Sequence, residues 1–281
     1  MTQTGFKKTA LIGCPVAQSL SPMMHQHWMQ QAGIEGEYKS IEVAPEALAA
    51  FVADARQSGL SGFNITVPHK TAILPMLDKV APLARQMGAV NTVKISADGS
   101  FSGFNTDGIG LVKHLKASAP GYPVDRPALI LGAGGAARAA AQGLLTENIP
   151  LVMITNRTRA KAEAIADAIG RGRMTVVDWD KRADAVAGAG LIVNTTVLGM
   201  AGQRALELDL TPASNDTVVY DIVYKPLETK LLAAARARDL RTVDGLGMLV
   251  HQGAAAFKIW FGVDVGFDVA LREKLEGALA C

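Results

Sequence analysis

The sequence is poor in cysteine, in aromatic side chains and in net charge, and each shortage excludes a class of protein. Its two cysteines, Cys14 and Cys281, stand near opposite ends of the 281 residues, which excludes a disulfide framework. The 28 basic and 26 acidic residues give a net charge of +2, without the basic clustering that binding to nucleic acid or an anionic membrane requires. Aromatic residues make up 5% and glycines number 28, a balance that favours a tight α/β protein over a β-sandwich.

Long apolar runs and metal-ligand patterns are also missing. No stretch of about 18 or more apolar residues occurs and no signal-peptide region follows the N-terminus, so we expect a cytoplasmic protein without membrane contact. The five histidines form no helical i,i+4 pair and the cysteines lack ligand spacing, so no metal site is predicted.

What is present is a core-forming composition in alternating strands and helices. Hydrophobic residues make up 49% of the chain and charged residues 19%, and the length suggests roughly two domains. In the N-terminal part we predict strands at 9–13, 38–43 and 62–67, a helix at 21–32 capped by Ser21, a helix at 47–57, and another helix that begins at Pro68. This alternation predicts a mainly parallel sheet.

A second unit follows the polar segment 118–123. Its predicted strands lie at 127–131, 151–155, 191–194 and 218–221, and the first of them is a continuous apolar run typical of a buried parallel strand. The series has the size of one nucleotide-binding domain. From Met248 onward the chain is predicted to be helical, and the pattern leaves open which domain this segment covers.

A glycine loop joins the first strand of the second unit to an Ala-rich helix. It has the pattern Gly132-x-Gly134-x-x-Ala137. The first glycine permits a tight turn, the second permits approach to a pyrophosphate, and the small third residue permits close helix–strand packing. We therefore predict dinucleotide binding rather than a merely structural turn.

The next strand ends in a basic turn, residues 156–161. An NAD site usually places an acid about 20 residues after the loop, whereas Arg157, Arg159 and Lys161 surround that place here. A ribose 2′-phosphate suits a guanidinium fork. The turn therefore favours NADP over NAD, with a solvated basic turn as the alternative.

Two ionisable residues could carry proton transfer. Lys70, expected in the first turn of a helix, is by itself most simply a surface charge, and Asp107 a turn or capping residue. Together they could move the proton of an alcohol or ketone while a nicotinamide moves the hydride. Ser19 and Ser21, two residues apart, would suit a carboxylate ligand at a helix N-terminus.

Taken together and in order, these pieces resemble the shikimate dehydrogenase family (shikimate/quinate dehydrogenases) over nearly the whole chain. The motifs that carry the resemblance are Gly13-Cys14-Pro15 with Ser19-Leu20-Ser21-Pro22, residues 62–70, residues 88–92, residues 103–108, residues 131–138, Asn156-Arg157-Thr158, residues 221–226 and residues 245–250.

The resemblance implies roles by position. For the substrate it implies Ser19 and Ser21 at the carboxylate, Lys70 as general acid/base with Asp107 beside it, and Thr66, Asn91, Tyr224 and Gln252 around the rest, with Asn64 a weaker candidate. For NADP it implies Gly132, Ala133, Gly134, Gly135, Ala136, Asn156, Arg157, Thr158 and Lys161, with Ile222, Gly245 and Met248 at the nicotinamide end.

The resemblance also implies a two-domain α/β fold and an activity. Its parts would be a substrate-binding and catalytic domain (1–107), a Rossmann-type NADP domain (108–244), and C-terminal helices (245–281) that return to the N-terminal domain. The implied reaction is the reversible reduction of 3-dehydroshikimate to shikimate with NADPH. A quinate/shikimate dehydrogenase working oxidatively and a catalytically silent NADP-binding regulator are the alternatives, and a homodimer is left open.

Overall fold

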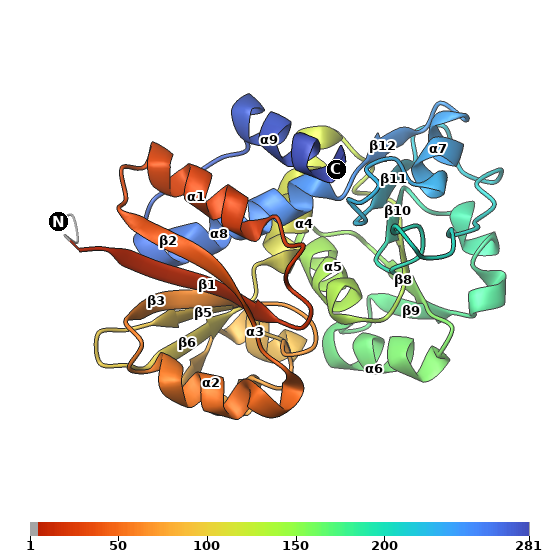
Figure 1. Ribbon diagram of the computed structural model, residues 1–281. Helices are drawn as coiled ribbons and strands as arrows, with labels where there is room; N and C mark the ends of the chain where they lie inside the picture. Colours follow the sequence, from red (N-terminus) through yellow and green to blue (C-terminus); the bar gives the residue numbers. More distant parts are fainter. Residues whose placement is uncertain (1–4, 281) are drawn as a thin grey trace. The chain divides into compact units, whose positions relative to one another are not determined.

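The computed structural model describes residues 5–280, which form two compact units (Figure 1). The first unit contains the described residues up to Thr106 together with those from Gln252 onward, and the second contains Asp107–His251. Each unit is built on its own β-sheet.

The sheet of the first unit has the strand order β2-β1-β3-β5-β6-β4. Its strands are β1 (Lys7–Gly13), β2 (Gly36–Glu42), β3 (Leu60–Ile65), β4 (Lys79–Val80), β5 (Thr92–Ile95) and β6 (Phe101–Phe104). Strand β1 pairs in parallel with β2 and β3, and β4 with β6, while β5 is antiparallel to both β3 and β6. The β5–β6 hairpin, which the sequence pattern did not predict, makes this sheet mixed.

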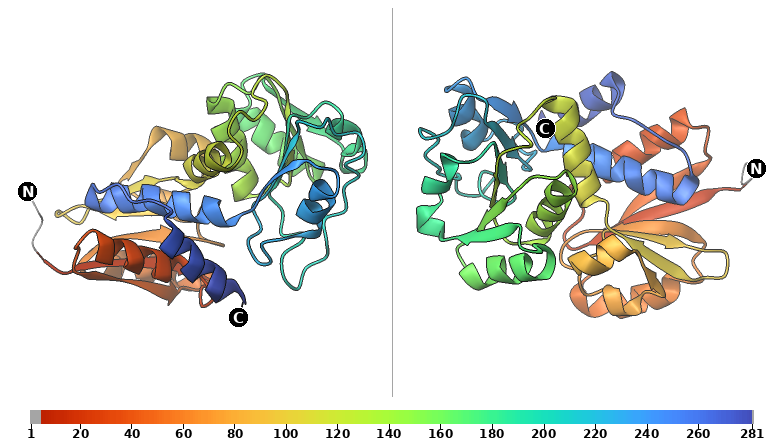
Figure 2. Two further views of the ribbon diagram at one scale, coloured as in Figure 1. Left: turned by 90° about the horizontal axis from the view of Figure 1, so that it is seen from above. Right: turned by 180° about the vertical axis from the view of Figure 1, so that it is seen from behind.

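Helices cover both faces of that sheet (Figure 2). They are α1 (Ser21–Gln31), α2 (Leu48–Ala55), α3 (Pro82–Met87), α9 (Val269–Ala280) and, from Gln252 on, α8 (Leu246–Phe261), with short 3₁₀ turns η1 (Pro45–Ala47) and η2 (Leu74–Met76). Neighbouring residues of β1 face opposite ways: Ala10 and Ile12 pack with α2 and α3, and Leu11 packs with Trp260 of α8. Both sides of the strand are therefore buried.

The second unit contains a parallel sheet of order β12-β11-β10-β7-β8-β9. Its elements are α4 (Asp107–Ser118), β7 (Ala128–Leu131), α5 (Gly135–Thr146), β8 (Val152–Thr155), α6 (Arg159–Ile169), β9 (Met174–Val177), η3 (Trp179–Lys181), η4 (Asp184–Val186), β10 (Leu191–Asn194), β11 (Val218–Asp221), α7 (Lys230–Arg236) and β12 (Arg241–Val243). Alternate residues of β7 belong to separate apolar clusters on the two faces. The predicted α/β class with a Rossmann-type second unit is confirmed.

The predicted helix that begins at Pro68 is wrong, and Lys70 lies in a series of turns instead. The reason is a long-range hydrogen bond: the carbonyl of Lys70 accepts from the backbone N–H of Val90 at 2.7 Å. That carbonyl is directed at Val90 rather than at the N–H of Leu74, its partner in a helical i→i−4 ladder, and the N–H of Leu74 binds the carbonyl of Thr71 instead.

The predicted N-cap of α1 is shifted by one residue. The helix already includes Ser21, and Leu20 occupies the cap position without a side-chain hydrogen bond. The hydroxyl of Ser19 accepts from the backbone N–H of Ser21 at 3.2 Å and so satisfies one unpaired donor of the first turn.

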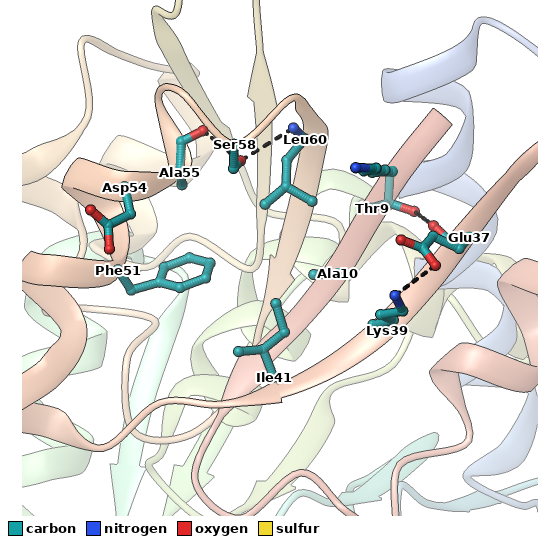
Figure 3. Close-up of a pocket in the computed structure, with 11 residues that line it drawn as sticks. Thr9, Ala10, Glu37, Lys39, Ile41, Phe51, Asp54, Ala55, Ser58 and Leu60 are labelled. Carbon is teal, nitrogen blue, oxygen red and sulfur yellow. Dashed lines mark hydrogen bonds and ion pairs between the residues drawn. The ribbon is translucent and has the colours of Figure 1, made fainter. Parts of the chain in front are cut away.

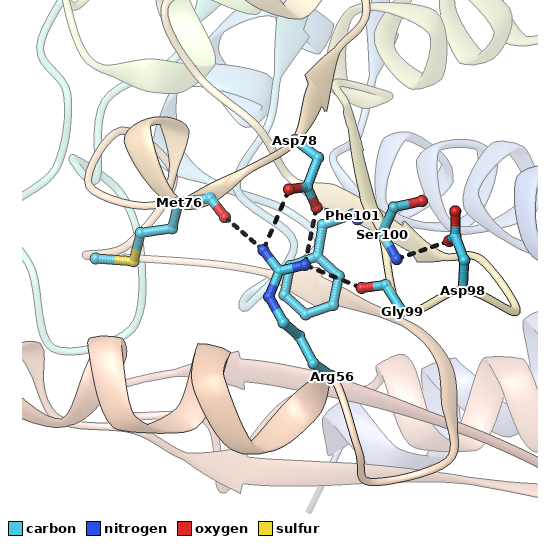
Figure 4. Close-up of polar contacts among 7 residues, drawn as sticks. All are labelled: Arg56, Met76, Asp78, Asp98, Gly99, Ser100 and Phe101. Atoms are coloured by element: carbon cyan, nitrogen blue, oxygen red, sulfur yellow. Dashed lines mark hydrogen bonds and ion pairs between the residues drawn. The ribbon is translucent and has the colours of Figure 1, made fainter.

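An arginine fastens the end of α2 to the far half of the first sheet (Figure 4). The Arg56 guanidinium pairs with Asp78 at 2.9 Å, donates to the carbonyl of Gly99 at 3.0 Å, and lies 4.3 Å from the ring centroid of Phe101. Asp78 also accepts from the N–H of Phe101 at 2.7 Å, and these donors lower the pKa of the Asp78 carboxyl. The cluster therefore joins a helix, strand β4 and the β5–β6 hairpin.

Candidate functional site

A buried amide is the centre of a polar network in the first unit. Asn91, just before β5, is 2% exposed. Its Nδ2 donates to Thr106 Oγ1 at 2.9 Å and to Gln252 Oε1 at 3.4 Å, and its Oδ1 accepts from the N–H of Thr106 at 2.9 Å and the hydroxyl of Thr92 at 2.9 Å. The structure thus brings together Asn91 and Gln252, two predicted substrate residues 161 positions apart.

Asn64, at the carboxyl end of β3, extends this network. The hydroxyl of Tyr38 donates to Asn64 Oδ1 at 2.9 Å, and Asn64 Nδ2 donates to the carbonyl of Asn91 and to Thr92 Oγ1 at 3.1 and 3.0 Å. Buried polar groups that are fully partnered hold one geometry. Sequence reasoning missed Tyr38, Thr92 and Thr106, although polar side chains at neighbouring strand ends were the available signal.

An aromatic stack adjoins this network through Tyr38. His25 is fully buried, and its ring lies parallel to that of Tyr38 with centroids 4.2 Å apart. Neither ring nitrogen of His25 has a hydrogen-bond partner among the described residues. Burial lowers the pKa of His25 to about 3 and raises that of Tyr38. Both rings are therefore neutral in the native protein at ordinary pH.

The segment that carries Thr66 and Lys70 is fixed by its backbone. The N–H of Thr66 donates to the carbonyl of Ile12 at 2.9 Å, and the ring of His69 bonds the carbonyl of Val43 at 2.7 Å. A Cβ at Gly13 would collide with the Thr66 methyl group, so this close approach requires glycine. Lys70 itself is half-buried.

The predicted proton-transfer residues belong to different units. Lys70 lies on the turn of the first unit, whereas Asp107 is the first residue of α4 in the second unit and is 6% exposed. Each is thus positioned by its own unit.

The glycine loop has the form that a phosphate site requires. The N–H of Gly132 donates to the carbonyl of Thr155 at 2.8 Å, its φ is +113°, and a Cβ there would lie 2.7 Å from Thr195 Oγ1. Gly134 and Gly135 are exposed, and an added Cβ at either meets nothing within 4 Å. Helix α5 begins at Gly135, so the loop presents an open helix N-terminus to an anion. These residues fit a dinucleotide pyrophosphate.

Ion pairs distinguish one cation of the basic turn, Arg159, from the other two. Arg159 binds Glu163 and Asp178 at 2.7 and 2.6 Å. Arg157 and Lys161 are exposed, and neither forms an ion pair within residues 5–280. Asn156 Nδ2 donates to the carbonyl of Thr158 at 2.9 Å and shapes the turn. Arg157 and Lys161 are therefore the cations best able to meet a 2′-phosphate.

The predicted cofactor residues Ile222, Gly245 and Met248 and the predicted substrate residue Tyr224 follow shortly after β11 and β12 in the chain. A Cβ at Gly245 would collide with the backbone of Ile222, so these two residues touch. Met248, in the first turn of α8, is 9% exposed, and Tyr224 is half-buried, with burial raising its pKa.

A separate pocket of about 210 Å³ lies beside β1 and β2 (Figure 3). Its lining is largely apolar and includes Ala10, Ile41, Phe51 and Leu60, together with charged residues such as Glu37. Its lining residues are different from all the predicted site residues.

Residues 5–280 contain neither a cluster of metal-ligating side chains nor a membrane-spanning helix. In the described part of the chain, no cluster of three or more His, Cys, Asp or Glu side chains could hold a metal ion. Within the same residues, no helix has the length and apolar character needed to cross a bilayer.

Comparison with known proteins gives a consistent result. Family models match in three parts: the shikimate dehydrogenase substrate binding domain (11–93), shikimate/quinate 5-dehydrogenase (120–222) and the shikimate 5'-dehydrogenase C-terminal domain (245–273). The chain is 46% identical to shikimate dehydrogenase (NADP(+)) of Rhodospirillum rubrum over 279 residues, which is 98% of this chain and 99% of the relative. It is also 46% identical to that of Paramagnetospirillum magneticum, over 90% of this chain and 91% of the relative.

Solved structures of similar fold contain different ligands. Shikimate 5-dehydrogenase from Thermus thermophilus, in complex with NADP(H) and shikimate, has a TM-score of 0.85 and 38% identity over 98% of both chains. Quinate dehydrogenase from Corynebacterium glutamicum, in complex with NAD, has a TM-score of 0.90 and 34% identity over 97% of this chain and all of that one. The extent of identity over both domains leaves one conclusion: this chain belongs to the shikimate dehydrogenase family.

Proposed function

We propose that this chain catalyses the reversible reduction of 3-dehydroshikimate to shikimate with NADPH. The observation that carries the proposal is 46% identity over 98% of the chain to a shikimate dehydrogenase (NADP(+)), together with the glycine loop and the cations Arg157 and Lys161. A regulator without turnover would have no need of Lys70 and the carboxylate serines.

The proposed substrate residues bind different groups of the substrate. Ser19 and Ser21 bind the carboxylate, and the amides of Asn91 and Gln252, held in the buried network, bind ring hydroxyls. Thr66, Asp107 and Tyr224 complete the set, with Asn64 supporting Asn91. Uncharged donors and acceptors of fixed geometry suit a polyhydroxylated ring.

The proposed chemistry centres on Lys70. Bound NADPH supplies the hydride for the ketone carbon. The Lys70 ammonium donates a proton to the ketone oxygen as negative charge develops there, and its charge stabilises that oxygen. In the oxidative direction the Lys70 amine takes the proton back from the alcohol.

The proposed cofactor residues lie in the second unit. The loop of Gly132, Ala133, Gly134, Gly135 and Ala136 would hold the pyrophosphate. Asn156, Arg157, Thr158 and Lys161 would hold the 2′-phosphate end, and Ile222, Gly245 and Met248 would line the nicotinamide end. Arg157 and Lys161 would give NADP its advantage over NAD.

The test is the absorbance of the reduced nicotinamide when the purified protein is mixed with shikimate or quinate, each with NADP or NAD. Reduction with shikimate and NADP supports the proposal. Quinate turnover with NAD would instead support the second candidate, an oxidative quinate dehydrogenase, which the similarity to the C. glutamicum enzyme favours. NADP binding without any turnover would support a regulator.

The same proposal predicts a cytoplasmic enzyme, with a homodimer as the assembly to test. Cell fractionation and light scattering of the purified chain are the corresponding measurements.

A further inference from the structure

A buried carboxylate stands at the carboxyl end of β11. Asp221 is 0% exposed. It accepts hydrogen bonds from Asn194 Nδ2 at 2.9 Å, from the N–H of Val223 at 3.0 Å and from the hydroxyl of Thr229 at 2.7 Å. Burial raises the pKa of Asp221 and these donors oppose the rise. Burying a carboxylate costs free energy unless hydrogen bonds of this kind compensate. The position of Asp221 therefore suggests a specific role.

Asn194 is the matching residue on the neighbouring strand. It stands opposite Asp221 in the parallel register of β10 and β11. Its Oδ1 accepts from the N–H and hydroxyl of Thr196 at 3.0 and 2.8 Å, and its Nδ2 also donates to the carbonyl of Leu198 at 3.1 Å. The Asn194–Asp221 pair therefore anchors the segment 195–199 after β10.

The other contacts of Asp221 anchor the segment 222–229 after β11. Thr229 is the N-cap of α7 and its hydroxyl also accepts from the N–H of Leu232. The N–H of Ile222 donates to the carbonyl of Asn194 at 3.1 Å, and the N–H of Ala201 donates to the carbonyl of Lys225 at 2.8 Å. One carboxylate thus connects two loops at one edge of the sheet.

These loops reach residues that the proposed function uses. Ile222 lies between Asp221 and Val223 and touches Gly245, and Tyr224 follows directly. On the other side, a Cβ at Gly132 would meet Thr195 and Thr196, so segment 195–199 lies against the glycine loop.

We propose that Asp221 is a positioning residue, whose buried carboxylate holds segments 195–199 and 222–229 so that Ile222 faces the nicotinamide ring of NADPH. The inference rests on the proposed function. The residue touches neither substrate nor cofactor in this role and acts through Ile222 and the two loops.

The test compares Asp221→Asn with the wild-type chain. The new amide NH₂ replaces Oδ2 and faces the Thr229 hydroxyl, which then loses its acceptor while the bonds to Oδ1 remain. Asp216→Asn is the matched control, because Asp216 is exposed and pairs only at the surface, with Arg126 at 2.6 Å. Steady-state kinetics and the fluorescence of bound NADPH are measured for each.

We expect Asp221→Asn to lower kcat on the order of tenfold, because small displacements of positioning groups cost up to about 100-fold. The Kd of NADPH should hardly change, since the phosphates are held by the glycine loop. The emission of bound NADPH should move toward that of free NADPH, which a merely structural role would not cause. Unchanged kcat and emission, as in Asp216→Asn, would overturn the inference.

A second pair of variants covers the case in which Asp221→Asn fails to fold. Thr229→Val removes the hydroxyl that donates to Asp221, and Thr229→Ser keeps it. We expect the valine variant to shift kcat and emission in the same direction as Asp221→Asn and the serine variant to match wild type. Equal behaviour of the two would contradict the inference.

The wild-type chain distinguishes failure of the proposed function from failure of this inference. If the wild-type chain binds no NADPH, both are contradicted. If the wild-type chain turns over normally and the variants are unaffected, the inference alone is contradicted.

Discussion

At the scale of single residues, Lys70 is the side chain on which the proposed chemistry depends. Acid/base groups contribute about 10²–10⁴-fold to rate. Lys70→Ala should therefore lower kcat by that range and change the KM for shikimate much less. Steady-state kinetics test this, with Lys79→Ala as the control because Lys79 is exposed on β4. Most of the wild-type turnover surviving in Lys70→Ala would remove Lys70 from this role.

Two arginines of one turn should behave differently toward NADP. Arg157 is exposed without an ion pair in the described chain, whereas Arg159 binds Glu163 and Asp178. A charge-assisted hydrogen bond contributes about 1.5–3 kcal/mol, so Arg157→Ala should raise the KM for NADP at least about tenfold. Its KM for NAD should stay the same, and Arg159→Ala should change either value only slightly. Equal effects of the two variants on NADP would argue against the assignment.

His25 should make stability depend on pH. Its pKa is about 3 in the folded protein against an ordinary 6.5, so the unfolded chain binds the proton between these values. Stability rises with pH wherever the unfolded state binds more protons. Below pH 6.5 the group should therefore cost about 1.4 kcal/mol per pH unit, down to about pH 3.

The variant His25→Phe isolates this effect, since phenylalanine has no proton to gain and suits the aromatic stack with Tyr38. Denaturant unfolding between about pH 7 and about pH 5 should show a shallower loss of stability in the variant than in the wild type. Parallel curves would mean that His25 is partnered or protonated in the folded protein.

At the scale of elements, Arg56 joins α2 to β4 and the β5–β6 hairpin. Arg56→Ala removes the pair with Asp78, the bond to Gly99 and the contact with the Phe101 ring together. We expect the thermal midpoint to fall by a few degrees and kcat to stay unchanged, because the cluster contains no proposed site residue. Arg236→Ala is the control, since Arg236, the last residue of α7, forms an exposed pair with Glu228. A variant as stable as wild type would show that the neighbouring packing alone holds these elements.

At the scale of the whole molecule, cofactor binding should appear as stability. A ligand at about 100 times its Kd stabilises the folded state by roughly 2.7 kcal/mol. NADP should therefore raise the thermal midpoint by several degrees at a concentration where NAD raises it little, because only NADP has the 2′-phosphate that Arg157 and Lys161 can meet. Equal shifts with the two cofactors would point to the NAD-linked alternative.

Some features of this protein were determined by local sequence. The apolar run of β7 followed by Gly132 and Gly134 predicted a buried parallel strand and a dinucleotide-binding loop, because a continuous apolar run is typical of a strand covered on both faces and glycine permits the tight turn that follows it. The alternation of strands and helices likewise predicted the α/β class. Motifs in order along the chain led to the family.

Other features were decided only by the tertiary structure. The N–H of Val90 donates a hydrogen bond to the carbonyl of Lys70, where the sequence predicted a helix. The carboxylate of Asp178 binds Arg159, which lies 19 positions away in the sequence. Asn91 meets Gln252 across 161 positions, and Asp221 connects two loops through Asn194. Each outcome depends on hydrogen-bond partners that are distant in sequence, and a local pattern carries no information about which distant donor or acceptor the folded chain brings near.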